Sequence, residues 1–225
     1  LTGMAYGSAG GVYTLLRAYQ LTGNSTYLNA AKEVGNWLIN TSGVAKRSTA
    51  GNITGSGQLK WKLAEGNETY YAGMAEGTAG VVEALAALYK ASSDTKYLNA
   101  SKEGANYLVA TASGGKWKVR EDVSVYSSSY SDGASGIIQA LLDVYGITGD
   151  ASYLSKAISA GDWLLSSSVA DDVDGYGMDG LGELRWRYIE NEDNYYVGLD
   201  GASGIISALM RLYQETSDSD YLNAI

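Results

Sequence analysis

The chain contains no Cys, His, Pro or Phe among its 225 residues. Because thiol and imidazole side chains are absent, this chain cannot form a Cys/His zinc site, a Ser-His-Asp triad, a cysteine nucleophile or a disulfide. Any catalysis by this sequence must therefore use carboxylates, hydroxyls, Tyr, Lys or Arg.

The charge balance and the lack of long apolar runs argue against nucleic-acid and membrane partners. The 25 acidic and 16 basic residues give a net charge of −9, so no dense basic patch is available for a nucleic acid or an anionic membrane surface. No apolar run approaches the roughly 18 residues of a membrane span. The sequence begins at Leu1 and ends within a helical pattern at Ile225, and we expect it to be a piece of a longer protein.

An internal repeat dominates the sequence. A short glycine motif recurs four times and ends at Gly10, Gly80, Gly136 and Gly204. Each of these glycines is followed by a Tyr nine residues later and by a Tyr-Leu pair 17 residues later. In the first three copies a Trp or Tyr also follows 27 residues later. A register kept over three or four copies indicates tandem structural units.

Each unit is predicted to be a pair of helices. In the first copy, Val12, Leu15, Leu16 and Tyr19 lie on one helical face. An Asn or Asp that lies 14 residues after the last motif glycine is the expected N-cap of the second helix. We expect a single all-α repeat domain over residues 1–225, with helix pairs at 3–41, 72–112 and 130–168, a truncated pair at 197–225, and insertions at 42–71, 113–129 and 169–196.

The three insertions share a triplet in which a Trp stands between two bases, at residues 60–62, 116–118 and 185–187. Alternation with a period of two predicts a short β-strand. We expect each Trp to face inward and the two bases to face the solvent.

The repeats resemble the lanthionine cyclase-like (LanC-like) family. The resemblance is carried by Gly-Leu-Asp-Gly-Ala-Ser-Gly-Ile at 198–205 and by Tyr-Gly-Ile-Thr-Gly-Asp-Ala-Ser-Tyr-Leu at 145–154. It implies an α/α toroid, with the first helix of each pair inside a ring and the second outside. The three full pairs and truncated fourth then form an open or incomplete ring, closed by further sequence or by a partner.

The same resemblance implies a zinc ion held by two Cys and one His, with the His directly before the first motif glycine. Here that position holds Tyr6, Glu76, Asp132 or Asp200, so zinc-dependent lanthionine cyclisation is not carried over to this chain.

The four residues in that register are the candidate ligand-binding residues. If the starts of neighbouring inner helices meet at one mouth, Glu76, Asp132 and Asp200 could act as the acid and base of an inverting glycosidase. They could instead contact a sugar or a cation, or each could simply be a helix N-cap. Tyr6 would then form a ring wall or a hydrogen-bond donor.

An acidic loop is a weak calcium candidate. Asp172, Asp174 and Asp179 give it a high density of carboxylates, but their spacing fails the EF-hand pattern. A solvated acidic loop is the alternative interpretation, and no other metal or cofactor is expected.

Five N-x-[ST] sequons predict N-linked glycans, and hence a secreted or cell-surface location. They all lie in the first half of the chain. The glycan-free residues 130–225 are therefore expected to contact a protein partner or another copy, through an apolar face at Leu209, Met210 and Tyr213. The sequon asparagines are Asn24, Asn40, Asn52, Asn67 and Asn99.

Two function hypotheses follow. The first is a non-catalytic domain of an extracellular glycoprotein, which serves binding or structural assembly. The alternative is a carbohydrate-active hydrolase or lyase that uses the paired carboxylates at the toroid mouth. The missing catalytic residue types favour the first.

Overall fold

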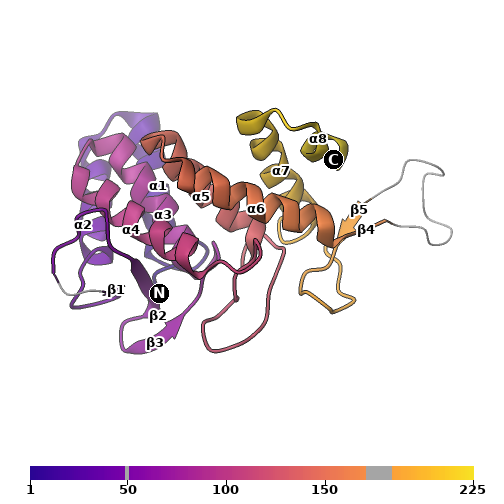
Figure 1. The fold of residues 1–225 in the computed structure, drawn as a ribbon. Coiled ribbons are helices and arrows are strands. Elements are labelled where there is room, and N and C mark those ends of the chain that lie inside the picture. Colours follow the sequence, from indigo (N-terminus) through magenta and orange to yellow (C-terminus); the bar gives the residue numbers. More distant parts are fainter. Residues whose placement is uncertain (49–50, 171–183) are drawn as a thin grey trace.

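The computed structural model describes residues 1–48, 51–170 and 184–225, and within these ranges it contains eight helices in four consecutive pairs (Figure 1). No helix in the described ranges is long and apolar enough to cross a membrane. The helices are α1 (Ser8–Thr22), α2 (Ser25–Leu38), α3 (Thr78–Ser92), α4 (Thr95–Thr111), α5 (Ala134–Thr148), α6 (Ala151–Ser167), α7 (Ala202–Thr216) and α8 (Ser219–Asn223).

The turn inside each helix pair has the predicted capping chemistry. Gly23 adopts a left-handed conformation after α1, with φ of 68°, and its N–H bonds to the carbonyl of Tyr19. Asn24 then caps α2, because its side chain accepts a hydrogen bond from the N–H of Thr26. The other three pairs repeat this arrangement with the N-caps Asp94, Asp150 and Asp218.

The first helices of the pairs form a central row. Helices α1, α3, α5 and α7 pack side by side in this order, and α2, α4, α6 and α8 each pack on the preceding member. Leu85 of α3 and Leu141 of α5 are completely buried in the shared core. This arrangement confirms the predicted all-α toroid class, and it forms an open row with α1 and α7 at its two ends.

The last glycine of each motif permits the close approach of the preceding loop to the start of its helix. A Cβ atom at Gly80 would lie 2.1 Å from the carbonyl oxygen of Met74, and one at Gly136 would lie 2.0 Å from that of Tyr130. Such approaches exclude any side chain. The repeated glycine therefore marks the place where the preceding loop crosses the start of its own helix.

Short strands lie on one side of the helical layer (Figure 1). The strands β1 (Ala45–Arg47), β2 (Leu59–Ala64) and β3 (Asn67–Tyr70) form an antiparallel sheet, and β4 (Ser168–Ala170) pairs with β5 (Leu184–Trp186). The triplet at 116–118 was also expected to be a strand, but it forms only isolated bridges, so that prediction is wrong in detail.

The three triplet tryptophans face inward, as predicted. Trp61, Trp117 and Trp186 are at most 3% exposed. Each indole N–H donates to a backbone carbonyl near the end of the preceding outer helix, and these acceptors are Leu38, Leu108 and Leu164. Because a buried indole N–H needs a partner, these bonds fix each insertion to its own helix pair.

Candidate functional site

The loops before the central helices are joined edge to edge. The N–H of Ala5 donates to the carbonyl of Ala75 over 2.9 Å, and the N–H of Ala75 donates to that of Ser131 over 2.8 Å. The N–H of Ser131 then donates to the carboxylate of Asp200 over 3.0 Å. These bonds place the four register positions in successive adjoining loops.

The hypothesis that Glu76, Asp132 and Asp200 are helix N-caps is wrong. The N-caps of α3, α5 and α7 are the following glycines, and none of these caps involves a side-chain hydrogen bond. These acids therefore have other contacts, or none.

We call Glu76, Asp132 and Asp200 the mouth acids, and two of them hold loops together. Asp132 accepts a hydrogen bond from the hydroxyl of Tyr188, and Asp200 accepts the N–H of Ser131. Glu76 is half-buried and makes no hydrogen bond or ion pair within the described residues. Tyr6 is 76% exposed. Of the four predicted positions, Glu76 is thus the carboxylate best placed to meet a ligand.

A second polar site lies on the central helices themselves, and we call it the inner polar row. The hydroxyl of Tyr13 on α1 donates to Glu83 Oε1 on α3 over 2.6 Å. On the neighbouring helices, Arg211 of α7 donates to Gln139 over 2.6 Å and to Asp143 over 3.1 Å, both on α5. Every helix of the central row therefore contributes a polar side chain.

The carboxyl of Glu83 has an incomplete set of partners. Its Oε2 atom is buried and has no hydrogen-bond partner in the part of the chain that the structure describes. Burial raises the pKa of Glu83 above its ordinary value; the hydrogen bond from Tyr13 lowers it, and the nearby charge of Asp143 raises it further. The raised pKa stabilises the protonated form of Glu83, which can donate a hydrogen bond.

Tyr130 has a pKa raised to about 12, first because of burial and then because of the charges of Glu83 and Asp143. Its hydroxyl therefore stays protonated at neutral pH. The carboxyl of Glu83 lies close enough to the phenol of Tyr130 to influence its pKa. In their protonated forms, both groups can donate hydrogen bonds to an oxygen-rich ligand.

Sequence reasoning missed the inner polar row, although the repeat register contains its signal. Tyr13, Glu83, Gln139 and Ser207 all lie three residues after the last motif glycine. Seven residues after that glycine, Asp143 and Arg211 occupy the same helical face in their copies. A polar stripe on helices that are otherwise apolar marks a face that is not part of the core.

The described residues do not fit the zinc site of the family that the sequence resembles. No group of three or more Asp and Glu side chains converges in a way that could hold a metal ion within the described ranges, and the sequence has no Cys or His. The calcium candidates Asp172, Asp174 and Asp179 lie outside the described residues.

The structure also places the sequons. Four of their asparagines are exposed, namely Asn24, Asn40, Asn52 and Asn67, whereas Asn99 is half-buried.

The expected apolar contact face is only partly available. Leu209 is completely buried within the chain, which corrects its expected exposure, whereas Met210 is 37% exposed and Tyr213 packs against the core. The more exposed side chains are Tyr196 at 52% and Val197 at 88%, in the loop before α7.

Comparisons with known proteins agree with this architecture. The sequence matches the family described as lanthionine synthetase C-like protein over residues 4–178. No curated protein matches it.

Three solved structures share the fold. Cellobiose 2-epimerase from Bacillus thermoamylovorans is similar with a TM-score of 0.64 and 16% identity, over 96% of this chain and 56% of that chain. A family 76 glycoside hydrolase (mannosidase) from Bacteroides thetaiotaomicron has a TM-score of 0.57 and 16% identity, over 96% and 56%. The Lin0763 protein from Listeria innocua has a TM-score of 0.54 and 22% identity, over 95% and 57%. The chain thus spans little more than half the length of these structures.

Proposed function

Because the chain belongs to the lanthionine synthetase C-like family but has no residues for that family's zinc, we propose that it is a carbohydrate-active repeat domain. In this proposal a sugar binds against the inner polar row. The sequence by itself favoured a non-catalytic role. The row of polar side chains and the two similar structures named as carbohydrate enzymes support the alternative hypothesis instead.

The observation that carries the proposal is the buried, unpartnered Oε2 atom of Glu83. An unsatisfied buried carboxyl oxygen costs about 1–3 kcal/mol, and a ligand hydroxyl would remove that cost. A carboxyl with a raised pKa is also the group that protonates a glycosidic oxygen. Glu83 would be the hydrogen-bond partner of the sugar and, if turnover occurs, its proton donor.

Binding and hydrolysis of neutral oligosaccharides test the proposal. We expect Glu83→Gln to weaken binding of the preferred oligosaccharide by about tenfold or more and to abolish any turnover. Glu33→Gln is the control, because Glu33 is exposed on the outer helix α2. If cello- and manno-oligosaccharides bind equally well to both variants, the inner polar row is not the sugar site.

The same activity could instead depend on the mouth acids, and mutation distinguishes this version from catalysis by Glu83. If Asp132→Asn or Asp200→Asn abolishes turnover while Glu83→Gln preserves it, the chemistry lies at the mouth. Circular dichroism must accompany these variants, because both aspartates hold neighbouring loops together.

A second candidate function is a non-catalytic domain of a secreted or cell-surface glycoprotein. It is favoured by the exposure of Asn24, Asn40, Asn52 and Asn67, each of which leaves room for a glycan. Glycopeptide mass spectrometry of the native material tests it. Unmodified peptides at all five sequons would contradict the proposed extracellular location.

Residues 130–225 would contact a partner or a second copy in this candidate function. The exposed Tyr196, Val197 and Leu199 support such a contact, because clustered apolar side chains favour association. Hydrogen exchange of the native assembly against the isolated chain measures it, and equal exchange over these residues would contradict it.

A further inference from the structure

Two pockets occupy equivalent places in successive repeats. The first, which we call the Tyr107 pocket, has a volume of about 400 Å³. It lies between the end of α4 and the insertion that follows. Its lining residues are Ala72, Tyr107, Thr111, Trp117, Lys118 and Glu121.

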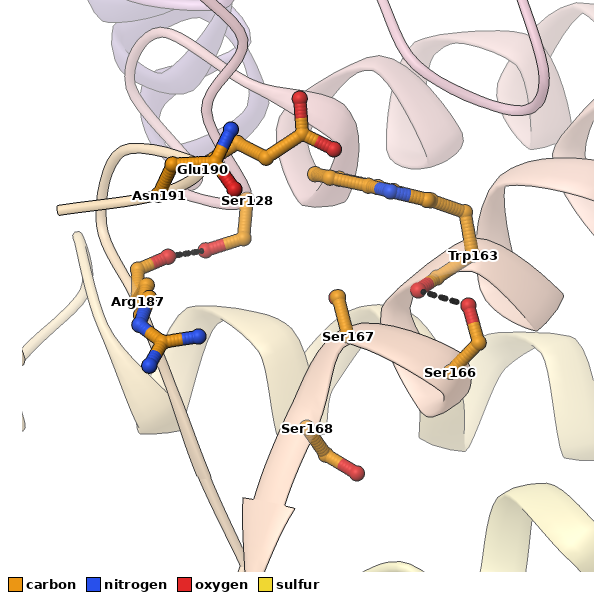
Figure 2. Close-up of a pocket in the computed structure, with 8 residues that line it drawn as sticks. All are labelled: Ser128, Trp163, Ser166, Ser167, Ser168, Arg187, Glu190 and Asn191. Carbon is orange, nitrogen blue, oxygen red and sulfur yellow. Dashed lines mark hydrogen bonds between the residues drawn. The ribbon is translucent and has the colours of Figure 1, made fainter.

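The second, which we call the Trp163 pocket, has a volume of about 350 Å³ (Figure 2). Five of its lining residues are the repeat equivalents of residues in the first pocket. Trp163 replaces the tyrosine and Ser167 the threonine, while a base and an acid are again present. These five residues are Ser128, Trp163, Ser167, Arg187 and Glu190.

Each pocket combines an aromatic face with hydroxyl groups and one pair of opposite charges. Figure 2 shows the indole of Trp163 on one side of the pocket, with Ser128 and Arg187 on the opposite side. Within the described residues the indole N–H of Trp163 makes no hydrogen bond, unlike that of Trp186, which bonds to Leu164. Trp163 can therefore offer both a stacking surface and a free donor.

The acid in each pocket keeps acceptor sites for a ligand. Glu121 accepts hydrogen bonds from Lys60 and from the hydroxyl of Tyr107, and Glu190 accepts one from Lys116. A carboxylate can accept about four hydrogen bonds. Because a base and an acid both line the pocket, it can donate hydrogen bonds to a ligand and accept them from it without favouring a net charge.

We propose that the Tyr107 pocket and the Trp163 pocket are two equivalent binding sites for neutral sugar units of a glycan. A pyranose ring has an apolar C–H face that stacks on an aromatic ring, and its hydroxyl groups both donate and accept hydrogen bonds. Each pocket volume falls within the range of about 300–1,000 Å³ typical of small-molecule sites. These sites are separate from the inner polar row and do not depend on it.

Pocket-filling variants test the proposal with little risk to folding. Thr111→Arg and Ser167→Arg fill one pocket each from the end of an outer helix. Thr41→Arg is the matched control, because Thr41 is the exposed equivalent in the first repeat and lines neither pocket. Circular dichroism and thermal unfolding check that the variants fold.

Calorimetric titration with cellotetraose and mannotetraose measures the outcome. In the Glu83→Gln background, which disables the inner polar row, we expect two equivalents to bind the chain and its Thr41→Arg control, one equivalent to bind each pocket variant, and binding to weaken at least about tenfold in the double pocket variant. Trp163→Ala should also reduce the fluorescence change that accompanies binding, and the part that remains would come from Trp117 in the Tyr107 pocket. Glu83→Gln should leave these two sites unchanged, so the proposal for the inner polar row and the proposal for the pockets can be refuted independently.

Three results would overturn the proposal. One is that neither tetrasaccharide binds, and another is that the double pocket variant binds as the chain without pocket substitutions does. The third is that an acidic oligosaccharide such as tetragalacturonate binds more tightly than the neutral ones, which would show that the pockets select charge.

Discussion

The ammonium group of Lys60 lies 2.6 Å and 2.5 Å from the two carboxylate oxygens of Glu121, in the next insertion of the chain. Lys60 also lies 3.9 Å from the ring centroid of Tyr70. Lys116 repeats both contacts with Glu190 and Tyr126. Each pair links one insertion to the next, so the expectation that these bases simply face the solvent is wrong for Lys60 and Lys116.

We expect Glu121→Gln to lower the free energy of unfolding by about 0.5–1 kcal/mol, since the pair is only partly buried. The effect should shrink in about 1 M salt because ions screen the attraction. Urea unfolding at two salt concentrations measures it, with Glu33→Gln as the exposed control. A loss that is equal at both salt concentrations would mean that packing, and not charge, is affected.

A hydrogen bond between the outer helices α6 and α4 predicts that two equivalent tyrosines contribute differently to stability. Tyr153 is 1% exposed and its hydroxyl donates to Asn106 Oδ1 over 2.8 Å. We expect Tyr153→Phe to cost about 1 kcal/mol of unfolding free energy, because the half-buried acceptor Asn106 loses its partner. The repeat equivalent Tyr27 is 36% exposed, so Tyr27→Phe should change stability by less than about 0.5 kcal/mol. Equal effects of the two substitutions in thermal unfolding would contradict this assignment.

The motif glycines predict opposite signs for two similar substitutions. Gly80→Ala should destabilise the chain by about 2–3 kcal/mol or more, because its Cβ would lie 2.1 Å from a carbonyl oxygen. Gly11→Ala should stabilise it by about 0.5–1 kcal/mol, since nothing lies within 4 Å of that Cβ and Ala favours a helix. Chemical denaturation of both variants checks the signs. A stabilised Gly80→Ala variant would refute the close approach.

The raised pKa of Glu83 predicts a pH dependence. Because the folded chain binds this proton more tightly than the unfolded chain does, its contribution to stability is fully present below the unfolded pKa of about 4.3. That contribution is lost as the pH rises through the higher folded pKa. Glu83→Gln should therefore gain stability relative to the unmodified chain between pH 4 and pH 7. Denaturation at several pH values measures the difference, and a constant difference would show that Glu83 does not titrate in this window.

Much of the fold could be predicted from short stretches of sequence. The apolar spacing around Leu15 and Leu16 predicts α1, and Asn24 marks the start of α2, because helical periodicity and capping depend on neighbouring residues. The repeat register then predicts every later pair, and the period-two alternation around Trp61 predicts its inward direction. Local rules suffice here because each copy forms the same local contacts.

Only the tertiary structure decided which side chains meet across the repeats. Glu83 and Tyr13 are 70 residues apart in sequence, and their contact depends on the angle and distance at which α3 packs on α1. The mouth acids show the converse: a shared register placed Asp132 and Asp200 in adjoining loops, yet packing directed them to Tyr188 and to the backbone of Ser131. Sequence periodicity specifies the face on which a residue lies, whereas its partner depends on how separate elements dock in three dimensions.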